Sequence, residues 1–213
     1  MQVKSKAMTA ADVMSTNLVM CDEFTTLVDA AKMMRTHHVS SIFVTHNKQI
    51  VGIWTESDCA KINFLAPNFS KAYIKDSMSS PVKKVTKQTL LPDVTAIFHH
   101  NHFRHLLVVD EVGGAVGIIS LSDVVKNQGL EHYLHFRQVD QSFNANVPII
   151  DSEQSINDVA QSMRHERVNA VLVFNQKLKQ TGIITERDLL NVLAESKSES
   201  HCWALASWPL LTI

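Results

Sequence analysis

The sequence predicts a mixed fold of helices and strands (α/β, also classed as α+β). It consists of three copies of one strand–helix–strand–strand–helix unit (βαββα). A seven-residue pattern of glycine, two apolar residues, a hydroxyl residue, two variable residues and aspartate occurs three times. The copies are GIWTESD at 52–58, GIISLSD at 117–123 and GIITERD at 182–188. Their glycines are residues 52, 117 and 182, so the period is 65 residues both times. A fixed period of this length indicates a structural repeat.

A stretch with the spacing of an amphipathic helix precedes each copy of the pattern. Apolar or small residues recur there at positions i, i+3, i+4 and i+7, which places them on one face of a helix. Helices are therefore predicted around residues 27–34, 91–98 and 156–163. Each of these stretches carries an aspartate at the same place: Asp29, Asp93 and Asp158.

Two strands are predicted between that helix and the aspartate that ends the pattern. The first is a run rich in β-branched and apolar residues, at 39–45, 103–110 and 168–174. A polar loop with turn-forming residues follows, and the second strand then runs through the glycine of the pattern. A short apolar helix follows each aspartate. The turn residues are Asn47, Gly113 with Gly114, and Asn175.

A unit of about 60 residues buries too little apolar surface to stand alone. Helices on one side of its small sheet also leave the other face of the sheet bare. We therefore expect the units to pair face to face. The predicted units are residues 8–65, residues 70–130, which pair with the first, and residues 137–196.

The end of the chain repeats the start of a unit. Unit 2 begins MSSPVKKV at 78–85, and in the final ASWPLLTI Pro209 falls where Pro81 falls. Residues 203–213 are therefore predicted to be the truncated first strand of a fourth unit. On this reading the chain is a piece of a longer protein.

Composition narrows the class of protein. The chain has 213 residues, of which 45% are hydrophobic and 19% charged, and a net charge of −1. A balanced charge gives no overall attraction to nucleic acid or to a membrane surface. No apolar run is long enough to span a membrane. The cysteines Cys21, Cys59 and Cys202 are far apart and form no CxxC motif, which favours reduced thiols and a cytoplasmic protein.

The tandem of βαββα units, each ending in G-h-h-[S/T]-x-x-D (h, apolar), resembles the CBS domain family (cystathionine-β-synthase motifs). The resemblance covers roughly residues 8–195. It implies that the motifs pair into a Bateman module with pseudo-twofold symmetry, and that modules often form dimers. It also implies clefts that bind adenine nucleotides or S-adenosylmethionine and a regulatory, non-catalytic role in signal transduction. We accordingly expect a homodimer and, in the full-length protein, a C-terminal effector domain.

The chemistry of the repeated pattern suits a ribose phosphate. An ionised aspartate accepts two hydrogen bonds from a vicinal diol. A hydroxyl and the free amides of a helix N-terminus suit a phosphate. The resemblance places ribose hydroxyls on the three aspartates, ribose or phosphate on the three hydroxyl residues, and phosphates on Arg187. AMP, ADP, ATP or S-adenosylmethionine is thus the expected regulatory ligand, with no other cofactor required. The predicted ligand-binding residues are Thr55, Asp58, Ser120, Asp123, Thr185, Arg187 and Asp188.

The same residues have a structural explanation. A hydroxyl followed three residues later by a carboxylate, before an apolar run, is also a capping box at the start of a helix. We expect the hydroxyls to cap the helices whether or not a ligand binds. The third unit is the best equipped for phosphate, because Arg187 stands next to Asp188. The alternative function is a structural dimerisation module with empty clefts.

Other chemistry finds little support in the sequence. The stretch HHNHFRH at 99–105 could hold a metal, but RTHH at 35–38 and RHER at 164–167 stand at the same place in the other units. Cations there complement the dipole at a helix C-terminus, so a basic turn is favoured and no metal site is expected. Trp54 is expected in the core more than against a base. GxSxG, HExxH, P-loop and GxGxxG motifs are absent, so no enzyme activity is expected.

Overall fold

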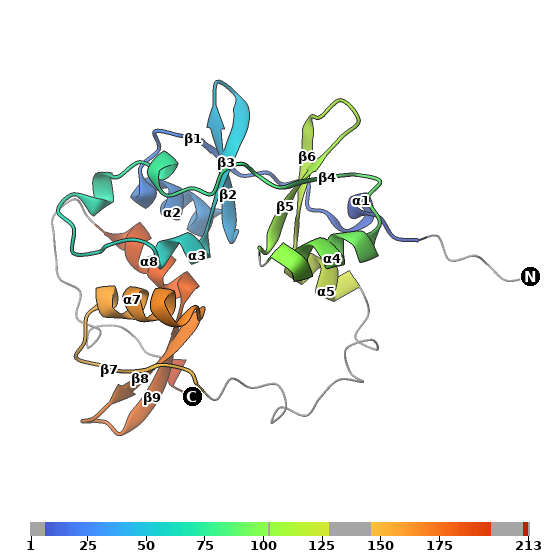
Figure 1. Ribbon diagram of the computed structural model, residues 1–213. Helices are drawn as coiled ribbons and strands as arrows, with labels where there is room; N and C mark the ends of the chain where they lie inside the picture. Colours follow the sequence, from blue (N-terminus) through green and yellow to red (C-terminus); the bar gives the residue numbers. More distant parts are fainter. Residues whose placement is uncertain (1–6, 102, 128–145, 197–210, 213) are drawn as a thin grey trace, which may run out of the picture. The chain divides into compact units, whose positions relative to one another are not determined.

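The computed structural model describes residues 7–101, 103–127, 146–196 and 211–212 (Figure 1). The chain folds into two compact units that exchange segments of sequence. The smaller unit consists of Met1–Leu18 and Pro81–Phe143, and the larger unit of Val19–Ser80 and Asn144–Ile213. The larger unit therefore holds most of repeat 1 together with repeat 3, and the smaller unit holds repeat 2.

Repeat 1 forms a three-stranded sheet with two helices. Its elements are β1 (Met20–Asp22), α2 (Leu27–Thr36), β2 (Ser41–His46), β3 (Gln49–Thr55) and α3 (Glu56–Cys59). The strand order is β1-β2-β3, with β1 parallel and β3 antiparallel to β2.

A two-residue turn joins β2 to β3. Asn47 and Lys48 have φ angles of 48° and 64°. Positive φ at both central residues is the conformation that a tight hairpin needs, and asparagine adopts it readily. The predicted turn at Asn47 is thereby confirmed.

Repeat 3 has the same order of elements. They are β7 (Ile149–Asp151), α7 (Ile156–Glu166), β8 (Ala170–Asn175), β9 (Gln180–Thr185) and α8 (Glu186–Glu195). A further short strand, β10 (Leu211–Thr212), pairs antiparallel with β9 and gives the order β10-β9-β8-β7. Most of the segment predicted to begin a fourth unit, residues 203–210, lies outside the described residues, so that unit stays a prediction.

Repeat 2 repeats the pattern in the smaller unit. Its elements are β4 (Lys84–Thr86), α4 (Leu91–Asn101), β5 (His105–Val109), β6 (Ala115–Ser120) and α5 (Leu121–Asn127). The order β4-β5-β6 and the strand directions are those of repeat 1. The predicted βαββα unit is thus confirmed in all three copies.

The repeated aspartates in the long helices explain where two of these helices begin. The hydroxyl of Thr26 accepts a hydrogen bond from the backbone N–H of Asp29 at 3.1 Å and donates to the Asp29 carboxylate at 2.8 Å. Ser155 and Asp158 make the same pair of contacts at the start of α7. A side chain that satisfies the free amides of the first turn fixes the start of a helix.

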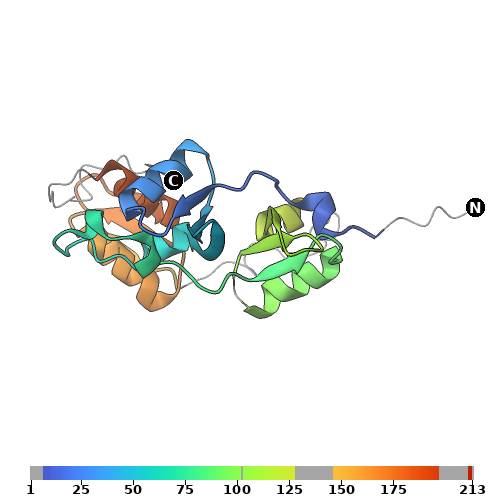
Figure 2. The same ribbon diagram turned by 90° about the horizontal axis from the view of Figure 1, so that it is seen from above.

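The larger unit has one core to which repeats 1 and 3 both contribute. Helix α8 packs against α2 and α3, and the helices of the two repeats lie between their sheets (Figures 1 and 2). Met34 and Trp54 from repeat 1 and Leu189 and Leu193 from repeat 3 are fully buried in this core. Pairing of repeat 1 with repeat 3 was not expected from the sequence. The expected pairing of repeat 1 with repeat 2 stays a prediction.

The segment that leads into repeat 1 belongs to the sheet of repeat 2. Helix α1 (Ala10–Val13) lies in the core of the smaller unit, and Ser15 exchanges two backbone hydrogen bonds of 2.8 Å with Ile118 in β6. In the larger unit Ser79, which leads into repeat 2, exchanges hydrogen bonds of 3.0 and 2.8 Å with Ile53 in β3. Repeats 1 and 2 therefore exchange their leading segments.

This exchange explains two of the three pattern glycines. A Cβ at Gly117 would lie 2.7 Å from Met14 Sδ and 2.8 Å from the carbonyl oxygen of Ser15. A Cβ at Gly52 would overlap the side chain of Met78. Glycine lets the leading segment approach the strand this closely.

Candidate functional site

All three hydroxyl–carboxylate pairs stand where the last strand of a repeat runs into its final helix. In each pair the backbone N–H of the hydroxyl residue donates to Oδ2 of the aspartate at 2.8 Å, and the hydroxyl donates to the same oxygen. These contacts belong to capping boxes, as expected. The hydroxyl-to-carboxylate distances are 3.0 Å for Thr55 and Asp58, 2.6 Å for Ser120 and Asp123, and 2.8 Å for Thr185 and Asp188.

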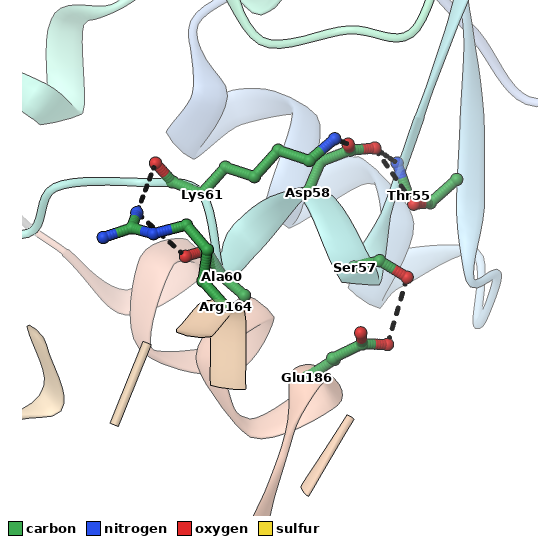
Figure 3. A network of polar contacts seen from close by, with 7 residues as sticks. All are labelled: Thr55, Ser57, Asp58, Ala60, Lys61, Arg164 and Glu186. Carbon is green, nitrogen blue, oxygen red and sulfur yellow. Dashed lines mark hydrogen bonds and ion pairs between the residues drawn. The ribbon is translucent and has the colours of Figure 1, made fainter. Parts of the chain in front are cut away.

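The three carboxylates differ in how fully they are engaged. Asp58 is 2% exposed, and its second oxygen, Oδ1, accepts a hydrogen bond of 2.5 Å from Lys61 (Figure 3). No described residue donates to Oδ1 of Asp123 or Asp188. A diol could therefore bind these two carboxylates without displacing a lysine.

Arg187 connects the two repeats of the larger unit. Its Nε donates to Oε1 of Glu56 at 2.9 Å, and the Glu56 side chain is only 15% exposed. One residue later in α3 and one residue earlier in α8, the hydroxyl of Ser57 donates to Oε2 of Glu186 at 3.1 Å (Figure 3). The predicted phosphate ligand Arg187 thus takes part in a contact between repeats.

A pocket of about 130 Å³ opens beside Arg187. The end of α2 and the first turns of α8 form its walls, so three groups that carry or can gain positive charge line it together with one carboxylate. This volume is below the roughly 300–1,000 Å³ typical of a pocket for a whole small ligand. It suits a phosphate group. The lining residues are Met34, Arg35, His38, Val39, Glu56, Arg187, Leu190 and Asn191.

Among the predicted ligand-binding residues, Arg187 lines this pocket. The sequence placed Arg35 and His38 in a basic turn at a helix C-terminus but did not bring that turn to Arg187. Repetition of the basic turn in all three repeats was the available signal. The contact with α8 depends on the packing of repeat 1 against repeat 3, which the sequence pattern does not specify.

A larger pocket of about 640 Å³ lies elsewhere in the larger unit, between α2, the short 3-10 helix η1 (Phe69–Lys71) and the end of α8. None of the predicted site residues lines it. Its polar lining mixes both signs of charge, with Asp29 and Glu195 beside Lys32 and Lys71.

Further sequence expectations can be compared with the described residues. Trp54 is fully buried, so its expected place in the core is confirmed. Cys21 and Cys59 are buried free thiols, and burial raises the pKa of both above the ordinary value for a thiol. Such thiols are poor nucleophiles at neutral pH. Cys202 lies outside the described residues.

The histidine-rich stretch ends helix α4. His99 and His100 occupy its last turn, whereas His102 lies outside the described residues. Within the described part of the chain, histidine, cysteine, aspartate and glutamate side chains nowhere gather in a group of three that could hold a metal ion. None of the described helices combines the length and the apolar character needed to cross a membrane.

The tandem βαββα repeats, each with a capped motif at the start of its last helix, define a class of tandem-repeat proteins. Comparison with known families gives the same class. The CBS domain family matches residues 10–63, 74–129 and 139–195. The chain belongs to the CBS domain family. CBS domains are regulatory modules.

Two relatives are longer than the part of them that this chain matches. A 17.7 kDa protein of Acidianus ambivalens is 34% identical over 103 residues, 47% of this chain and 61% of its own length. Protein MJ1225 of Methanocaldococcus jannaschii is 25% identical over 195 residues, 86% of this chain and 69% of its own length. The chain thus spans about two thirds of the length of these relatives.

Solved structures share the fold. The crystal structure of MJ1225 superposes with a TM-score of 0.72 at 16% identity, over 88% of this chain and 73% of that one. CBSX2 in complex with AMP has a TM-score of 0.51 at 25% identity, over 59% of this chain and 98% of that one. The CBS domain pair of MJ0100, in complex with 5-methylthioadenosine and S-adenosyl-L-methionine, has a TM-score of 0.53 at 23% identity. The match covers 59% of this chain and 99% of that one.

Proposed function

We propose that this protein is a cytoplasmic, non-catalytic regulatory module that binds an adenine nucleotide or an adenosyl ligand in a cleft of its CBS repeats. Binding controls an attached effector domain in signal transduction, and the module acts as a homodimer. The ligand is AMP, ADP, ATP or S-adenosylmethionine. The observation that carries the proposal is the capped motif of repeat 3, which stands next to a basic pocket.

The arrangement at repeat 3 supports a ligand with a ribose and a phosphate. Oδ1 of Asp188 accepts no hydrogen bond from a described residue, so it can accept one from a ribose hydroxyl. Arg187, Arg35 and His38 line one small pocket that a phosphate group would fill. Guanidinium groups bind phosphate oxygens with two parallel hydrogen bonds, which adds both strength and orientation.

Binding would act on the contact between repeats. A phosphate in the pocket competes with Glu56 for the guanidinium group of Arg187. A ligand that draws Arg187 away from Glu56 favours a different arrangement of repeats 1 and 3. It shifts the population of the module by its difference in affinity for the two arrangements. The effector then responds to that shift.

A thermal-shift series on the whole chain tests the proposal. AMP, ADP, ATP and S-adenosylmethionine are each added at rising concentration. A ligand at 100 times its Kd stabilises the folded chain by about 2.7 kcal/mol. For a chain of this size that is a rise in Tm of about 5–10 °C.

Asp188→Asn, with Asp123→Asn as its matched partner in repeat 2, locates the site. Because each substitution also weakens a helix cap, the ligand-induced rise in Tm is compared, not Tm itself. We expect Asp188→Asn to remove the rise and Asp123→Asn to leave it. Absence of a rise with all four ligands contradicts the proposal.

One observation favours the alternative of a structural module without ligand. The capping boxes already engage the hydroxyls of Thr55, Ser120 and Thr185, and Glu56 already engages Arg187. Under this alternative Asp188→Asn lowers Tm slightly through the helix cap, by about 0.5–2 kcal/mol of stability. It changes no ligand response, because there is none.

A further inference from the structure

The first turns of α3 and α8 meet through the two variable positions of the repeated motif. These positions are Glu56 and Ser57 in repeat 1, and Glu186 and Arg187 in repeat 3. The contacts are reciprocal, because the first position of each repeat meets the second position of the other. Ser57 donates to Glu186 at 3.1 Å, and Arg187 donates to Glu56 at 2.9 Å.

Repeat 2 carries different chemistry at the same two positions. Leu121 stands where the other repeats have glutamate, and Ser122 follows it. The Leu121 side chain offers neither a carboxylate nor a cation, and this residue is 38% exposed.

The largely buried carboxylate of Glu56 in repeat 1 determines which partner fits. Glu56 is only 15% exposed, and a charge that is largely removed from water needs a partner of opposite charge. Repeat 3 supplies the guanidinium group of Arg187. In the same reciprocal geometry repeat 2 would supply only the hydroxyl of Ser122.

The second contact distinguishes the same partners. Ser57 meets the carboxylate of Glu186 in repeat 3, whereas it would meet the apolar Leu121 in repeat 2. Pairing of repeat 2 with repeat 3 would set Arg187 against Leu121. Only the pairing of repeats 1 and 3 gives both glutamates a donor and the arginine an acceptor.

We propose that the two residues between the hydroxyl residue and the aspartate of each motif select which repeats pack together through their final helices, and that Glu56 with Arg187 selects repeat 3 as the partner of repeat 1 on this helical side. The selection does not require a large stabilising energy. An ion pair in which one partner stays exposed to water is in general a weak stabilising interaction. Discrimination comes mainly from the poor contacts that a wrong partner would make.

Cross-linking of the whole chain tests the choice of partner. Arg35→Cys and Asn191→Cys put thiols at two positions that line one pocket, one in repeat 1 and one in repeat 3. The matched control combines Arg35→Cys with Lys126→Cys, because Lys126 holds in repeat 2 the position that Asn191 holds in repeat 3. Cys202→Ser is included in both. With a short bis-maleimide, we expect several-fold more cross-link between 35 and 191 than between 35 and 126.

Charge reversal then tests whether Glu56 and Arg187 are the residues that select the partner. Glu56→Arg sets two guanidinium groups against each other, so we expect the 35–191 cross-link to fall several-fold and Tm to fall by about 2–4 °C. Glu56→Arg combined with Arg187→Glu restores an ion pair and should recover both. Leu121→Arg, at the equivalent position of repeat 2, should leave the 35–191 cross-link unchanged.

Two results would overturn the proposal. One is a 35–126 cross-link as strong as the 35–191 cross-link in the otherwise unchanged chain. The other is a double reversal that behaves as the sum of its single substitutions, because independent effects mean that the two side chains do not act on each other. The experiment uses no ligand, so its outcome is independent of the proposed nucleotide binding.

Discussion

Leu190 in α8 and Val125 in α5 hold the same position in repeats 3 and 2, yet their surroundings differ. Leu190 is 2% exposed in the core shared by repeats 1 and 3, whereas Val125 is 44% exposed. Both helices begin with the same capped motif and follow the same kind of sheet. The local sequence therefore builds the helix, and the partner repeat determines how much of it is buried.

The largest expected difference between the two units comes from this position. Leu190→Ala should lower the free energy of unfolding by about 2–5 kcal/mol, because a fully buried leucine leaves a cavity. Val125→Ala should change it by less than about 0.5 kcal/mol, as at other exposed sites. Urea denaturation followed by circular dichroism measures both. Equal losses would mean that Val125 is also buried in solution, and the contrast between the units would disappear.

The second largest expected difference is between the stability costs of alanine at Gly117 and at Gly52, the two pattern glycines under the exchanged segments. Gly117→Ala should cost about 1–3 kcal/mol, because the new methyl meets the backbone oxygen of Ser15. Gly52→Ala meets only the flexible side chain of Met78, which can move, so it should cost less. Amide hydrogen exchange at Ile118 and Ile53, which donate to Ser15 and Ser79, reports each contact separately.

A control separates the two explanations for Gly52. Met78→Ala removes the side chain that a Cβ at position 52 would overlap. Adding Gly52→Ala to Met78→Ala should then cost little further stability. If the full cost of Gly52→Ala persists without the methionine side chain, the contact with Met78 does not explain the glycine.

A smaller effect concerns one position that is fully buried in every repeat. Cys59 in repeat 1 corresponds to Val124 in repeat 2, and both are 0% exposed. Burial raises the pKa of the Cys59 thiol well above its ordinary value, so the folded chain holds the thiol proton more tightly than the unfolded chain. Stability should therefore fall as pH rises above about 8.5, where an exposed thiol ionises. Urea denaturation at pH 7.5 and 9.5 measures this, and Cys59→Ala should reduce the slope.

Thiols at this position can be used to compare how often the two units open to solvent. Cys59 reports on the larger unit, and Val124→Cys in a Cys59→Ala background reports on the smaller one. Because the smaller unit has the smaller core, we expect its thiol to react faster with a disulfide reagent at pH 8. Equal rates would indicate that the chain opens as a whole.

The repeat, the order of its elements and the capping boxes could be predicted because they depend on residues close together in the sequence. An apolar stripe predicts a helix, Asn47 predicts a turn, and a hydroxyl three residues before an aspartate predicts a capping box. Each pattern lies within a few consecutive residues. The family and its fold follow from the same features. The ligand-binding role of Asp188 and Arg187 stays a prediction.

Contacts between distant residues could not be predicted in this way. Glu56 and Arg187, which meet where repeat 1 packs against repeat 3, occupy the positions that vary between copies of the motif. The exchange of leading segments was also missed. Its signal was present, since repeats 1 and 2 both begin with Met-Ser, and both of these methionines, Met14 and Met78, lie over a pattern glycine.

The exchanged segments also set an order of events during synthesis on the ribosome. Ser15 is made early, but its partner Ile118 follows about 100 residues later, which at about 5–20 residues per second is on the order of 5–20 s. Until then the apolar face of α1 has no sheet to cover. The nascent chain must therefore keep this amphipathic segment unpaired while repeat 1 emerges. During this interval the apolar face of α1 is exposed, and a chaperone could bind it.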